Sequence, residues 1–174
     1  DDKKGNERAV HVEISNLSWE ALAKKSEYYP SKTDKYKKTK KGWKLVLPNE
    51  YKTKILKRPF NAIPARAFGE RGYFSKNING KTVRMWDFTE EQYKSLEKLC
   101  VGLHKLLPRI KLKVPFDKKT GRYPLNRLNN YSSFSGVLGH CHVQNGSTGL
   151  ECKYDPGSAF NWGRLHRAFK KVKS

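Results

Sequence analysis

The sequence predicts an α/β fold in which a mixed central sheet is flanked by helices. Three observations carry this prediction: a strand rich in β-branched residues over 10–14, an Asn79-Gly80 turn between apolar segments, and a long amphipathic helix after Thr89. A length of 174 residues suits a single domain over 1–174. The apolar share of 36% and the mean hydropathy of -0.85 indicate a small core with long solvated segments.

The first predicted element is a buried strand over residues 10–14. Because side chains alternate along a strand, His11 and Glu13 would share one face of it. From about residue 19 to 81 the chain is a basic, irregular insertion divided by four prolines, in which 43–47 is the only convincing strand. We expect 19–81 to wrap the rim of a pocket and not to form a second domain.

The long helix has the clearest local signals. Thr89 can cap it, Gln92 completes a capping box, and Phe88 and Tyr93 are placed as a hydrophobic staple. Leucines then recur at helical spacing until Pro108, so one face of this helix is predicted to be buried against a sheet.

Two extended segments and a helix are predicted after the long helix. Residues 110–114 alternate with lysines and favour a short extended segment, and an apolar strand over 132–138 leads into His140. The stretch 158–171 predicts a final helix with an apolar side and a basic side.

The charge of the chain favours an anionic partner. The formal charge of +21 arises from 37 basic and 16 acidic residues, which suits nucleic acid, an anionic cell-wall polymer or a membrane surface. One basic cluster over 24–44 is interleaved with aromatic residues, and a second covers 164–173. Such aromatics suit stacking on bases or sugar rings, and a solvated insertion with packed aromatics is an equal interpretation. No apolar run in the sequence approaches membrane-spanning length.

Three cysteines leave at least one thiol unpaired within the chain. Cys100 falls on the apolar face of the predicted helix, which indicates a buried thiol. Cys141 and Cys152 could form a disulfide or supply a thiolate. The sequence contains no Cys-x-x-Cys pair, so it does not indicate a zinc finger.

Two motifs near the carboxyl end carry chemistry. Gly139-His140 follows the apolar segment, and the stretch 153–157 reads Lys-Tyr-Asp-Pro-Gly. Histidine and aspartate are both zinc ligands, and an extended Lys-x-Asp stretch places Lys153 and Asp155 on the same side. Taken singly, His140 also fits a structural histidine, Asp155 a helix-capping turn and Lys153 a surface lysine.

These motifs closely resemble those of the zinc-dependent N-acetylmuramoyl-L-alanine amidases, whose fold is shared with peptidoglycan recognition proteins. The family signature is Gly-His near a strand end, here Gly139-His140, then Lys-x-Asp-Pro-Gly, here 153–157, and then an aromatic-x-Trp helix start, here 160–162. The stretch 9–16 is similar to the family strand that carries the catalytic glutamate. The stretch 86–92 is similar to the turn into the family's long helix.

The resemblance implies a hydrolase that cleaves the bond between N-acetylmuramic acid and L-alanine in peptidoglycan or muropeptides. It implies Zn²⁺ held by His140 and Asp155, with Glu13 as the general base and Lys153 stabilising the oxyanion. The family takes its first zinc histidine from a strand upstream of the glutamate strand. We therefore expect that ligand to come from an N-terminal segment missing here, from a second chain, or from His11.

A different class of function is the alternative prediction. A catalytically inactive protein of the same fold could serve as a nucleic-acid-binding or ribosome-associated scaffold, or as a peptidoglycan-binding module. An active amidase would be extracellular or associated with the cell wall, whereas a scaffold would be intracellular or organellar.

Overall fold

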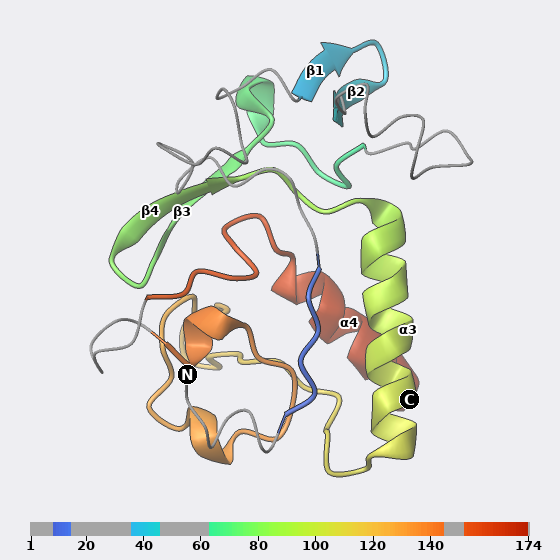
Figure 1. The fold of residues 1–174 in the computed structure, drawn as a ribbon, viewed down its shortest axis with the longest axis vertical. Helices are drawn as coiled ribbons and strands as arrows, with labels where there is room; N and C mark the ends of the chain where they lie inside the picture. The colour runs from blue at the N-terminus through green and yellow to red at the C-terminus, as the bar shows by residue number, and fades with distance from the viewer. Residues whose placement is uncertain (1–8, 15–35, 46–62, 145–151, 174) are drawn as a thin grey trace.

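The computed structural model describes residues 9–14, 36–45, 63–144 and 152–173 of the chain. These residues form a mixed α/β protein (Figure 1). Its elements in chain order are β1 (Tyr36–Thr39), β2 (Gly42–Leu45), the 3-10 helix η2 (Gly69–Arg71), β3 (Phe74–Ile78), β4 (Lys81–Met85), α3 (Glu90–Leu106), the 3-10 helices η3 (Tyr131–Ser133) and η4 (His140–His142), and α4 (Trp162–Lys173).

Each strand of the described residues pairs with its neighbour in sequence. β1 pairs with β2, and β3 pairs with β4, both antiparallel. The turn between β3 and β4 has positive φ angles of 48° at Asn79 and 83° at Gly80, the conformation that favours Asn-Gly. The predicted hairpin around this turn is therefore confirmed. Residues 43–45 of the predicted strand 43–47 belong to β2, and residues 46 and 47 lie outside the described part.

The predicted central sheet is not formed by the described residues, whose strands make two separate two-stranded sheets. The strand predicted over 10–14 is wrong, because the segment is not a strand and leaves Val10 49% and Val12 44% exposed. The strand over 132–138 is also wrong. There the Val137 amide donates one hydrogen bond to the Lys113 carbonyl, at 2.9 Å, without a continuing ladder. A strand needs a row of such bonds.

Helix α3 begins as its local sequence predicts. The Thr89 hydroxyl accepts a hydrogen bond from the Gln92 amide at 3.2 Å, and the Thr89 amide donates to the Gln92 side chain at 2.9 Å. The rings of Phe88 and Tyr93 meet edge to face, with centroids 5.9 Å apart. Both the capping box and the hydrophobic staple are therefore confirmed.

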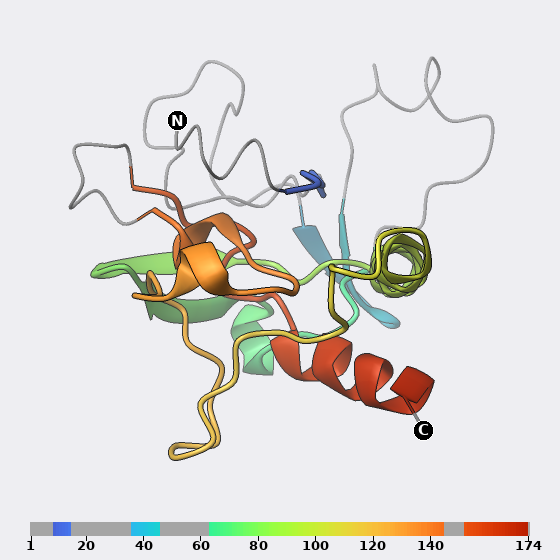
Figure 2. The same ribbon diagram turned by 90° about the horizontal axis from the view of Figure 1, so that it is seen from below.

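Helix α4 begins at Trp162, later than the predicted 158. The reason is that the preceding backbone groups bind elsewhere: the Asn161 amide donates to the Tyr93 hydroxyl at 2.9 Å. The Asn161 side chain then accepts from the Arg164 amide at 3.0 Å, as an N-cap does. Figure 2 shows α3 end-on with α4 nearby, and Arg164 joins the two helices through ion pairs to Glu90 and Glu97 of α3, both at 2.6 Å.

The main core lies between helices α3 and α4, the end of β4 and the segment that follows β4. Its buried residues are Met85, Phe88, Tyr93, Leu96, Cys100, Leu112, Val114, Ala159, Phe160, Trp162, Leu165 and Phe169. The apolar side predicted for the last helix is confirmed, because Phe160, Leu165 and Phe169 are all buried. Neither helix of the described residues is long and apolar enough to cross a membrane.

A buried carboxylate ties three segments to this core. Asp87 accepts hydrogen bonds from Arg66 Nε at 2.6 Å, from the Tyr93 hydroxyl at 2.5 Å and from the Phe88 amide at 3.0 Å. Arg66 also donates to the Ala159 carbonyl. Burial and the nearby Asp87 carboxylate raise the pKa of Tyr93, so its hydroxyl remains a donor at neutral pH.

Replacing the Asp87 carboxylate will test how much it contributes to the stability of the fold. We expect Asp87→Ala to lower the free energy of unfolding by about 3 kcal/mol, because Arg66 and Tyr93 lose their buried partner. Denaturation in urea measures the change. Asp117→Ala is the matched control, since Asp117 caps an exposed turn through Thr120. Equal losses in the two variants would contradict a special role for Asp87.

Candidate functional site

The two carboxyl-end motifs lie against each other. The Cys141 amide donates to the Asp155 carbonyl at 3.0 Å, which joins η4 to the Asp-Pro-Gly turn. Gly139 makes this approach feasible, because a Cβ there would lie 2.4 Å from Pro156 Cδ and 2.8 Å from the Asp155 carbonyl oxygen. Any larger residue at 139 would push the two segments apart.

His140 and Asp155 meet through their side chains at the surface. His140 Nδ1 lies 3.4 Å from Asp155 Oδ2, and the side chains are 52% and 53% exposed. Their neighbours Cys141 and Tyr154 are buried. The alternation of a half-buried Lys153, a buried Tyr154 and an exposed Asp155 is the burial pattern expected of an extended Lys-x-Asp stretch.

His11 approaches this pair from the segment 9–14. Its ring centroid is 6.4 Å from that of His140. Two imidazoles and a carboxylate are a donor set that suits zinc. In the described part of the chain, however, no three such side chains are close enough to hold a metal ion. Since zinc–nitrogen distances are about 2.0–2.1 Å, His11 would have to move toward His140 before both could bind one ion.

The other two predicted site residues are Glu13 and Lys153. Glu13 is exposed and lies two residues beyond His11, and the contacts of the described residues include none between Glu13 and His140. Lys153 is half-buried, and its carbonyl is held by the Asn79 side chain at 3.2 Å. The structure thus brings His140, Asp155 and His11 together, whereas the catalytic roles of Glu13 and Lys153 stay predictions.

Asn79 is the positioning residue that the sequence reasoning missed. Its side-chain amide donates to the carbonyls of Cys141, Gln144 and Lys153 at 3.0, 3.0 and 3.2 Å. Its side-chain oxygen accepts from the Arg127 amide at 2.9 Å. The Asn-Gly pattern predicted the turn, but it gave no signal that the asparagine side chain would hold both site segments.

His142 is a structural residue and not a metal ligand. It is fully buried, its Nδ1 accepts from the Gly139 amide at 3.0 Å, and its Nε2 lies 2.9 Å from the Pro124 carbonyl. These contacts require a neutral ring that carries its proton on Nε2. Burial lowers the pKa of His142 accordingly.

The three cysteines are all free, so the disulfide considered between Cys141 and Cys152 is absent. Burial raises the pKa of Cys141 to about 12 and that of Cys100 to about 11. Neither thiol is therefore poised to act as a thiolate ligand at neutral pH. The predicted buried thiol at Cys100 is confirmed.

Comparison with protein-family models, with curated proteins and with solved structures found no match for this chain.

The buried His142 predicts a pH dependence of stability. Because its pKa is lowered from 6.5 in the folded state, the unfolded state binds a proton first as the pH falls below about 6.5. The free energy of unfolding should then fall with a slope of up to ~1.4 kcal/mol per pH unit until the folded-state pKa is reached. Urea denaturation between pH 4.5 and 8 measures this slope.

A neutral replacement provides the control for this pH dependence. Glutamine in His142→Gln offers one acceptor and one donor but does not titrate, so the His142 part of the slope should disappear. The same slope below pH 6.5 in wild type and variant would show that other groups cause it.

Asn79 can be tested without disturbing its turn. Asn79→Gly keeps a residue suited to φ 48° but removes the side-chain bonds, so we expect a loss of about 2 kcal/mol in unfolding free energy. Hydrogen exchange at the Cys141 amide should become faster, because its bond to Asp155 loosens. Asn77→Ala on the same hairpin is the control. Unchanged exchange at Cys141 in Asn79→Gly would contradict the positioning role.

Proposed function

We propose that this protein is a zinc-dependent amidase that hydrolyses the bond between N-acetylmuramic acid and L-alanine in peptidoglycan. The observation that carries the proposal is the meeting of His140 and Asp155, 3.4 Å apart, from the two motifs that resemble the amidase signature. The position of His11 beside His140 supports it further, since it adds a second imidazole.

The exposure of this pair favours a working site over a structural ion pair. An ion pair between side chains that are 52% and 53% exposed contributes little to stability, because water screens it. The backbone nevertheless brings the two residues together through a glycine at 139 and through the Asn79 side chain. Asp87 shows the opposite arrangement, a buried carboxylate that accepts three hydrogen bonds from within the protein.

Each residue has a defined role in the proposed reaction. His140 and Asp155 would hold zinc, and His11 would be the third ligand after moving toward His140. When bound, zinc supplies a water of near-neutral pKa and polarises the amide carbonyl. Glu13 accepts the proton of the attacking water and returns it to the departing amine. Lys153 stabilises the negative charge that develops on the carbonyl oxygen.

The second candidate function is a nucleic-acid-binding scaffold without catalysis. The observation that favours it is the formal charge of +21, which attracts any polyanion. Salt-sensitive RNA binding by a protein that takes up no zinc would support the scaffold over the amidase.

Zinc uptake and amide hydrolysis test the proposal together. We expect the wild-type protein to bind one zinc ion and to release alanine-terminated peptides from muropeptides. His140→Ala and Asp155→Ala should each lose both properties, whereas Glu13→Ala should keep zinc and lose activity by about 10²–10⁴-fold. Elemental analysis and chromatography of the peptides provide the measurements.

A histidine outside the site supplies the control. His104 Nδ1 contacts the Ile110 carbonyl at 2.7 Å, so His104→Gln should keep both zinc and activity. His11→Ala tests whether His11 is the third ligand. If the zinc affinity does not change in this variant, the third ligand comes from another segment or chain. A wild-type protein that takes up no zinc and cleaves no muropeptide would contradict the proposed function.

A further inference from the structure

The β1–β2 hairpin concentrates positive charge on one exposed element. Residues 36–45 contain lysines at five positions and no acidic residue. The side chains of these lysines are all exposed: Lys37, Lys38, Lys40, Lys41 and Lys44. None of them takes part in the ion pairs found among the described residues. A bound anion would reduce their mutual repulsion.

The hairpin is anchored to the rest of the protein, so these charges have a fixed place. The Trp43 ring packs against the Trp86 ring in a tilted arrangement, with centroids 4.8 Å apart and an interplanar angle of 57°. Gly72 packs against both, since a Cβ there would lie 2.2 Å from Trp86 and 2.6 Å from Trp43. Trp86 directly follows β4, which fixes the hairpin relative to the β3–β4 sheet.

The turn of the hairpin is also ordered by local bonds. The Thr39 hydroxyl donates to the Gly42 carbonyl at 2.7 Å and accepts from the Lys41 amide at 3.2 Å. Gly42 has a φ of 103°, which a residue with a Cβ rarely adopts. The two lysines of the turn, Lys40 and Lys41, therefore project from a defined backbone.

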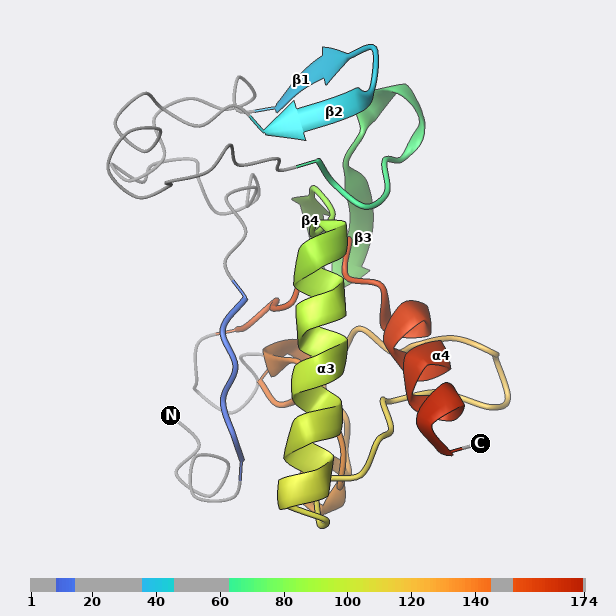
Figure 3. The same ribbon diagram turned by 90° about the vertical axis from the view of Figure 1, so that its right-hand side faces the viewer.

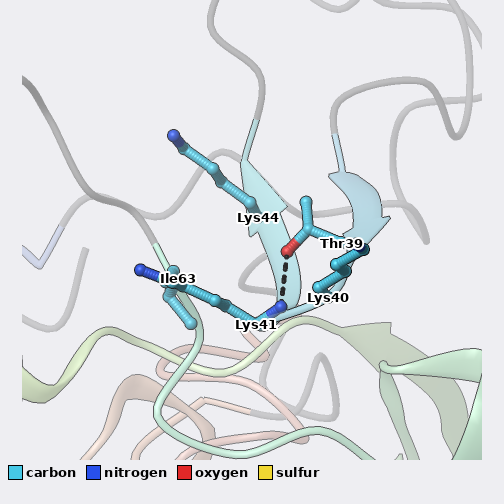
Figure 4. Close-up of a pocket in the computed structure, with 5 residues that line it drawn as sticks. All are labelled: Thr39, Lys40, Lys41, Lys44 and Ile63. Atoms are coloured by element: carbon cyan, nitrogen blue, oxygen red, sulfur yellow. Dashed lines mark hydrogen bonds between the residues drawn. The ribbon is translucent and has the colours of Figure 1, made fainter.

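A cavity of about 340 Å³ lies on this hairpin. It is lined by Thr39, Lys40, Lys41, Lys44 and Ile63. Figure 4 shows the side chains of Lys41 and Lys44 extending to the same side of the hairpin, with Ile63 near Lys41. An anionic group in this cavity would lie close to lysine ammonium groups, with the apolar side chain of Ile63 beside them.

We propose that the β1–β2 hairpin is a docking surface for an anionic cell-wall polymer with a phosphodiester backbone, such as poly(glycerol phosphate). Lysine ammonium groups act as point charges on flexible stems, which suits phosphates that recur along a flexible chain. A binding site for single-stranded nucleic acid adds aromatic rings that stack on bases. Trp43 instead packs on Trp86, which favours a polymer without bases.

The choice of a cell-wall polymer rests on the proposed amidase function. The location of the docking surface and its preference for phosphate groups rest on the hairpin alone. The hairpin lies beyond the amino-terminal end of α3, and η4, which carries His140, lies well away from it along the long axis (Figures 1 and 3). A polymer bound at the hairpin would therefore hold the protein on the wall and leave the candidate site open to peptidoglycan.

Two triple variants with the same loss of charge test the docking surface. One carries Lys40→Gln, Lys41→Gln and Lys44→Gln on the hairpin. The control carries Lys94→Gln, Lys98→Gln and Lys105→Gln, which are exposed positions of α3. The probe is purified poly(glycerol phosphate), and its affinity is measured by calorimetry at several salt concentrations. Poly-dT is the comparison ligand.

The hairpin variant should bind poly(glycerol phosphate) roughly tenfold more weakly, and the slope of log K against log salt should fall by about 2, because each phosphate contact on a flexible polyanion contributes about 0.7. The α3 variant should bind nearly as wild type. Hydrolysis of soluble muropeptides should be unchanged in both variants, since none of these lysines belongs to the candidate site.

The outcomes separate this proposal from the proposed function. Equal weakening in the two triple variants would overturn the docking surface, because net charge alone would then explain binding. Loss of poly-dT binding with unchanged poly(glycerol phosphate) binding would overturn the choice of polymer in favour of nucleic acid. Hairpin-dependent polymer binding by a protein that cleaves no muropeptide would support the surface while contradicting the amidase.

Discussion

The close packing of Gly139 against Asp155 and Pro156 is the constraint on which the candidate site depends. With no Cβ at 139, the Cys141 amide reaches the Asp155 carbonyl at 3.0 Å, and the side chain of His140 comes within 3.4 Å of the Asp155 carboxylate. Asn79 then holds both segments from the tip of the β3–β4 hairpin. A residue of a local turn therefore also holds a segment more than sixty positions further along the chain.

The polar groups discussed above fall into three environments: buried, half-exposed and exposed. Asp87 and His142 are buried, and each has its hydrogen-bonding groups matched by fixed partners. Buried groups matched in this way stabilise one arrangement of the chain and are poorly placed to exchange partners. His140 and Asp155 lie half-exposed beside His11, where an ion and a substrate can reach them. The lysines of β1–β2 are a third, exposed set, suited to long-range attraction.

Local sequence signals predicted the elements that depend on near neighbours. The Asn79 hairpin and the Thr89 capping box form as expected, because their bonds join residues within a few positions. The strand over 10–14 was not predictable in this way, since a strand exists only where a distant partner pairs with it. The late start of α4 had a similar cause, a bond from Asn161 to the Tyr93 hydroxyl across 68 positions. For the site, the motifs predicted that His140 and Asp155 lie close together. They gave no signal that the Asn79 side chain would bind both segments.

The proposed function requires His140 and Asp155 to bind one zinc ion at the surface where they meet. A crystal structure grown with zinc, with anomalous scattering recorded at the zinc edge, tests it most directly. We predict a single strong anomalous peak about 2.0–2.2 Å from a His140 ring nitrogen and from an Asp155 carboxylate oxygen. A structure in which these two side chains still contact each other directly, with zinc absent or bound elsewhere, would contradict the account.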